Sequence, residues 1–132
     1  MTKFLVRSEG VDLDTQFARL AALEAGWYDG KGEALTVEAL RTARWFLDLA
    51  TEQGIPRPHL YPTEEGAVRA EWSTAMPRRE VSIEWTAARV YLHSVDIQGD
   101  GCEELDVEAT AVMQVAIALR RLLISISEET GA

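Results

Sequence analysis

The sequence has little cysteine and little histidine, which limits metal and thiol chemistry. Its one cysteine, Cys102, excludes an intramolecular disulfide. Together with His59 and His93, it gives no set of nitrogen and sulfur donors at the spacing of a zinc site. Acidic residues flank Cys102 in the sequence and disfavour its thiolate form. We therefore expect no metal ligands and no cysteine nucleophile.

The sequence also lacks a long hydrophobic run. Its longest weakly polar stretch, from Ala109 to Leu119, is interrupted by Gln114 and is too short to span a bilayer. The first ten residues contain no apolar segment of the length found in signal peptides. We expect a cytoplasmic protein without a membrane partner.

Basic residues are scarce as well. There are 13 of them against 22 acidic residues, which gives a formal net charge of -9 and a pI near 4.7. This charge repels nucleic acid, so direct nucleic-acid binding is not expected. The sequence contains no phosphate-binding loop and no Gly-x-Ser-x-Gly motif, so we expect neither a cofactor nor catalytic residues. The acidity is consistent with solubility alone, or with a partner that has a basic groove.

What is present is typical of one globular domain over residues 1–132. The length suits a single core, and 47% hydrophobic residues is an ordinary proportion. After an extended arm with a short strand at 4–6, apolar residues at helical spacing predict helices over 12–25 and 36–53. Asp12 and Thr36 are suitable N-caps for these helices.

The middle of the chain predicts an antiparallel sheet. Three prolines between residues 56 and 62 disfavour helix and leave an edge strand at 59–61. Apolar and polar residues then alternate over 67–72, 79–85 and 89–97, as in half-buried strands. The alternation assigns Trp72 and Trp85 to the inner face.

The last part of the chain predicts a turn over 98–104 and a long helix over 105–127. This helix is apolar almost all round between Ala109 and Leu119, which is typical of a central buried helix or a subunit interface. We expect it to pack on the sheet and to leave an apolar patch for a partner. The predicted fold is α+β: two N-terminal helices, a three- to four-stranded antiparallel sheet, and the C-terminal helix on the sheet.

The outer face of this sheet is a candidate site. Pairing Trp72 with Val81 places six polar side chains on one surface: Arg69, Glu71, Ser82, Glu84, Tyr91 and His93. Carboxylates, a histidine and a tyrosine can act as general acids and bases. The same residues are common on exposed sheets, where cross-strand charge pairs fix the register, and the sequence favours this second interpretation.

Two loops offer further candidates. Trp27 and Tyr28 lie in a glycine-rich loop at 26–35, where they either anchor a partner or fold back as a lid on the core. The segment 96–101 resembles the start of a calcium loop, but Val107 occupies the position of the bidentate glutamate. A tight polar turn is therefore predicted there.

Several short motifs follow one another along residues 26–84: Gly-Trp-Tyr-Asp-Gly-Lys-Gly at 26–32, Pro-Arg-Pro at 56–58, Tyr-Pro-Thr at 61–63, Gly66, Glu-Trp at 71–72 and Glu-Val-Ser-Ile-Glu at 80–84. In their order and spacing they resemble those of a group of small uncharacterised bacterial proteins. Trp85 stands where that group has an aliphatic residue, and the C-terminal helix shows no match. The resemblance implies an accessory protein of bacteria or their mobile elements, and it implies no activity.

These observations predict a small acidic, non-enzymatic protein that binds another protein or forms a homodimer. One version is an inhibitor, encoded by a phage or mobile element, of a nucleic-acid-binding defence complex. Another is a small acidic chaperone. The alternative is a small hydrolase or ligand-binding domain that uses Glu71, Glu84, Tyr91 and His93 on the polar sheet face.

Overall fold

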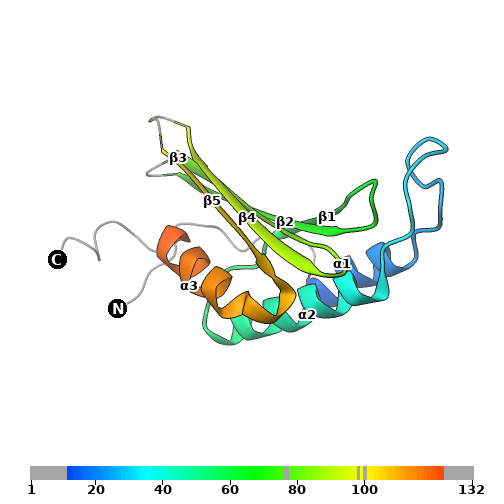
Figure 1. The fold of residues 1–132 in the computed structure, drawn as a ribbon, viewed down its shortest axis with the longest axis horizontal. Coiled ribbons are helices and arrows are strands. Elements are labelled where there is room, and N and C mark those ends of the chain that lie inside the picture. The colour runs from blue at the N-terminus through cyan, green and yellow to red at the C-terminus, as the bar shows by residue number, and fades with distance from the viewer. Residues whose placement is uncertain (1–11, 76–77, 98, 100, 124–132) are drawn as a thin grey trace.

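The structure, a computed structural model, describes residues 12–75, 78–97, 99 and 101–123. It confirms an α+β fold in which three helices pack on one face of an antiparallel sheet (Figure 1). The expected strand at 4–6 lies outside the described residues. The elements are α1 (Leu13–Ala21), α2 (Val37–Glu52), β1 (His59–Pro62), β2 (Val68–Ala75), β3 (Arg78–Trp85), β4 (Arg89–Asp96), β5 (Cys102–Glu108), a 3-10 turn (Ala109–Ala111) and α3 (Val112–Leu123).

Helices α1 and α2 begin where their caps predict. Asp12 Oδ1 accepts the Thr15 amide at 2.8 Å, and the Thr36 hydroxyl accepts the Ala39 amide at 3.1 Å. Helix α1 ends four residues earlier than predicted. Beyond Leu20 no residue up to position 25 is fully buried, so tertiary packing does not support another turn.

The sheet is a meander in which each strand pairs with the next in the order β1-β2-β3-β4-β5. The predicted register is confirmed: Trp72 lies opposite Val81, and Arg69 lies opposite Glu84. Because side chains alternate between faces, this register also fixes which residues of each strand point away from the helices.

Strand β5 was not predicted. Residues 102–104 were assigned to a turn and residues from 105 to a helix, but the segment 102–108 pairs with β4 along its whole length. Its partly buried residues alternate with four exposed ones, Cys102, Glu104, Asp106 and Glu108. The sheet therefore has five strands, and α3 starts only at Val112.

The core lies between the sheet and the three helices. Trp72 and Trp85 are almost completely buried, as predicted, and the Trp72 indole donates to the Pro56 carbonyl at 2.8 Å. Phe46 of α2 packs against Trp85, with ring centroids 5.4 Å apart. The buried face of α3 confirms that this helix packs on the sheet. None of the helices in the described part of the chain is long and apolar enough to cross a membrane.

One end of the sheet is tied to α3 by a polar contact. Arg79 of β3 donates from Nε to Asp96 Oδ1 at 2.6 Å, and from a terminal nitrogen to the Leu122 carbonyl at 2.7 Å. The Asp96 amide donates to the Gly101 carbonyl at 2.9 Å, which closes the turn after β4. Asp96 thus pairs with Arg79; the predicted polar turn over 96–101 includes positions 98 and 100, which lie outside the described residues.

Candidate functional site

The face of the sheet opposite the helices is open in the described part of the chain (Figure 1). The structure brings together on it the six polar residues expected from the sequence. Ser82 lies opposite His93, and Glu84 lies opposite Tyr91. Strand β1 extends this face, because His59 lies opposite Glu71. We call this surface the open face.

Charged groups on the open face interact with one another, although not all in the expected way. The Arg69 Nε donates to Glu71 Oε2 at 2.7 Å, along the same strand rather than across to Glu84. A cross-strand hydrogen bond does join the Ser73 hydroxyl to the Glu80 carboxylate at 3.0 Å. These contacts resemble the pairs that stabilise an exposed sheet.

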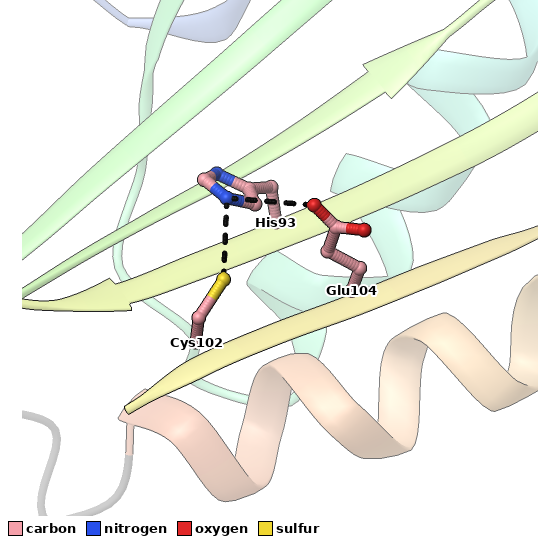
Figure 2. Close-up of side chains that lie close together, drawn as sticks. All are labelled: His93, Cys102 and Glu104. Atoms are coloured by element: carbon pink, nitrogen blue, oxygen red, sulfur yellow. Dashed lines mark hydrogen bonds and ion pairs between the residues drawn. The ribbon is translucent and has the colours of Figure 1, made fainter. Parts of the chain in front are cut away.

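A group of three metal-ligating side chains lies on the open face where β4 and β5 meet (Figure 2). The thiol sulfur of Cys102 is 3.7 Å from His93 Nε2, and Glu104 Oε1 is 3.8 Å from the same nitrogen. The three ligand atoms all lie within 4.8 Å of one another. We call this group the His-Cys-Glu cluster.

Only His93 of this cluster was expected on the open face. The sequence predicts a turn at Cys102 and Glu104, and a turn there does not place them beside a histidine. The sequence signal for their position is the period-two spacing of Cys102, Glu104 and Asp106. Residues two apart lie on the same face of a strand, so a strand over 102–108 places all three on one face.

Tyr91 interacts with two members of the cluster, His93 and Glu104. Its ring stacks on the His93 imidazole, with centroids 6.3 Å apart and planes 9° apart. A hydrogen bond to the Glu104 carboxylate raises the pKa of Tyr91, with smaller effects from burial and from neighbouring acidic groups. Tyr91 therefore restrains both His93 and Glu104.

A second candidate surface is an apolar groove between α2 and α3. Its rim is formed by Trp45 and Leu49 of α2, and by Met113 and Ile117 of α3. These side chains are 50%, 36%, 60% and 67% exposed. They surround a hollow of about 100 Å³ with an apolar floor. We call this the α2–α3 groove.

The groove contains the apolar patch that the sequence predicted on the C-terminal helix. Helix α2 contributes to the groove as well. Phe46 and Ala50 are buried beneath it, whereas the Trp45 side chain is half exposed at its rim.

The loop that carries Trp27 and Tyr28 is organised by its own residues. The Trp27 indole donates to the Glu33 carbonyl at 2.8 Å. Gly32 has a φ of +91°, and a Cβ there would lie 2.8 Å from the Trp27 ring. Trp27 thus packs within the loop, while Tyr28 is 55% exposed at its surface.

Comparisons of this chain with protein-family models, with curated proteins and with solved structures found no match. The open face and the α2–α3 groove are therefore the features from which a function can be inferred.

Proposed function

We propose that this chain is a protein-binding protein that holds an amphipathic helix of its partner in the α2–α3 groove. The observation that carries this proposal is the clustering of four exposed apolar side chains around one hollow. Exposed apolar residues scattered singly are normal, but a contiguous group with a tryptophan and a methionine is typical of a binding surface.

The size of the hollow favours a protein over a small ligand. Pockets for small molecules commonly measure about 300–1,000 Å³. The groove holds about 100 Å³, which suits one inserted side chain but not a whole ligand. A groove between two helices that accepts single apolar side chains is a common way to bind an amphipathic helix.

The charge of the chain indicates the chemistry of the partner. A net charge of -9 attracts cationic surfaces and repels anionic ones. We therefore assign to the partner helix an apolar face that enters the groove and a polar face rich in lysine and arginine. This positive charge complements the acidic chain as a whole and not the groove lining, whose charged residue is Arg120. Such a pairing associates fast at low salt and more slowly as salt rises.

A synthetic peptide tests the proposal directly. A helical peptide with leucines along one face and lysines on the other should bind the full chain, as measured by fluorescence anisotropy. Trp45→Ala and Ile117→Glu should each weaken binding at least about tenfold, because both remove apolar contact from the rim.

Val37→Glu is the matched control, because Val37 is 61% exposed on α2 but lies outside the groove. It should leave peptide affinity unchanged. Equal losses in Val37→Glu and Ile117→Glu would show non-specific binding and overturn the proposal. A dimer in light scattering that Ile117→Glu dissociates would also overturn it, because the groove would then hold a second copy.

A further inference from the structure

The His-Cys-Glu cluster presents an imidazole nitrogen, a thiol sulfur and a carboxylate oxygen at one point. This mixture of donors is the one that Zn²⁺ uses in proteins, whereas calcium and magnesium prefer oxygen alone. None of these residues belongs to the α2–α3 groove, so the cluster is independent of the proposed protein-binding surface.

Two of the three donor separations are close to those of a zinc site. In a tetrahedral site with bonds of about 2.0–2.3 Å, neighbouring donor atoms lie about 3.3–3.6 Å apart. Cys102 Sγ lies 3.7 Å from His93 Nε2, and that nitrogen lies 3.8 Å from Glu104 Oε1. The third pair, Cys102 Sγ and Glu104 Oε1, lies within 4.8 Å, so binding of the ion requires the exposed Cys102 and Glu104 side chains to rotate toward each other.

The arrangement differs from that of a catalytic triad. In a triad the nucleophile contacts one nitrogen of the histidine, and the acid orients the ring through the other nitrogen. Here Cys102 and Glu104 both face Nε2 of His93 (Figure 2). Three groups that converge on one point are suited to share a metal ion rather than to relay a proton.

We propose that His93, Cys102 and Glu104 form a zinc-binding site on the open face of the sheet. The paired strands β4 and β5 fix the backbone positions of all three ligands. Tyr91 acts as a positioning residue, because it stacks on His93 and hydrogen-bonds to Glu104. Three protein ligands leave a fourth position, and the half-exposed side chains of His93 and Glu104 give the ion access.

Cobalt provides the most informative probe, because Cys102 is the only cysteine in the chain. Metal-free full-length protein should take up one Co²⁺ per chain and develop the absorption bands of a tetrahedral cobalt–thiolate site. Zn²⁺ should displace the cobalt. Cys102→Ser should lose the thiolate band, and His93→Ala should weaken zinc binding by about 100-fold or more.

His59→Ala is the matched control, because His59 is also on the open face but on β1, away from the cluster. It should bind zinc as the unchanged protein does. Tyr91→Phe keeps the stacked ring and loses the hydroxyl, so it should weaken zinc binding by about tenfold. Melting temperatures measured without metal show whether each variant is folded.

Two results would overturn the proposal. One is the absence of a cobalt–thiolate band in the folded, reduced protein at millimolar cobalt. The other is an equal zinc affinity in folded His93→Ala and His59→Ala, which would place the metal elsewhere.

Discussion

The two faces of the sheet are made from the same strands and have opposite properties. On the inner face, Ile83, Trp85 and Leu92 are completely buried against the helices. On the open face, Glu84, Tyr91 and His93 alternate with them and remain partly exposed. Neighbouring residues of one strand therefore differ in role: the inward set holds the fold together, and the outward set remains accessible to solvent.

The largest loss of stability should come from truncating a large side chain on the inner face. Trp72→Ala should lower the free energy of unfolding by about 3–5 kcal/mol, because it leaves a cavity and removes the donor to the Pro56 carbonyl. Urea denaturation measures this. Glu71→Ala, one residue away on the open face, should change stability by less than about 1 kcal/mol. Similar losses of stability in the two variants would contradict the stated difference between the two faces.

An intermediate loss of stability is expected from replacing a polar residue on the inner face. Arg79 joins Asp96 to the end of α3 and its side chain is 19% exposed. Arg79→Met should cost about 1.5–3 kcal/mol, the usual worth of hydrogen bonds to a charged group. The neighbouring exposed Arg78 gives the control, and thermal unfolding of Arg78→Met should match the unchanged protein.

The smallest effect on stability should come from removing the ion pair on the open face. Arg69 and Glu71 are 44% and 37% exposed, so solvent screens their attraction. A double-mutant cycle with Arg69→Met and Glu71→Gln should give a coupling below about 1 kcal/mol that fades with added salt. A larger coupling that does not depend on salt would mean that the open face also contributes substantially to the stability of the fold.

Much of the fold was predictable because its signals are local. Asp12 and Thr36 mark helix starts through their side-chain hydrogen bonds. The alternation over β2 to β4 fixes both the inward tryptophans and the register, since a shift of one residue would expose them. Six polar residues of the open face followed from that register alone.

The remaining features depend on contacts that local patterns do not contain. Strand β5 has only Leu105 and Val107 as apolar inner residues. The apolar run that starts at Ala109 has helical spacing, and extending this helix toward the N-terminus includes β5 by mistake. Without β5, nothing brings Cys102 and Glu104 to His93. The exposure of Trp45 likewise depends on where α3 lies, which the pattern of α2 does not specify.

In our proposal the partner helix binds in the α2–α3 groove. The four tryptophan indole N–H signals in an NMR spectrum test it directly. Trp45 lines the groove, Trp27 lies in its own loop, and Trp72 and Trp85 lie in the core. Adding the leucine–lysine peptide should shift the Trp45 signal most and leave the Trp27 signal in place, whereas Trp85, which packs against Phe46 beneath the groove, can shift slightly. A shift of Trp27 with Trp45 unchanged would contradict the account.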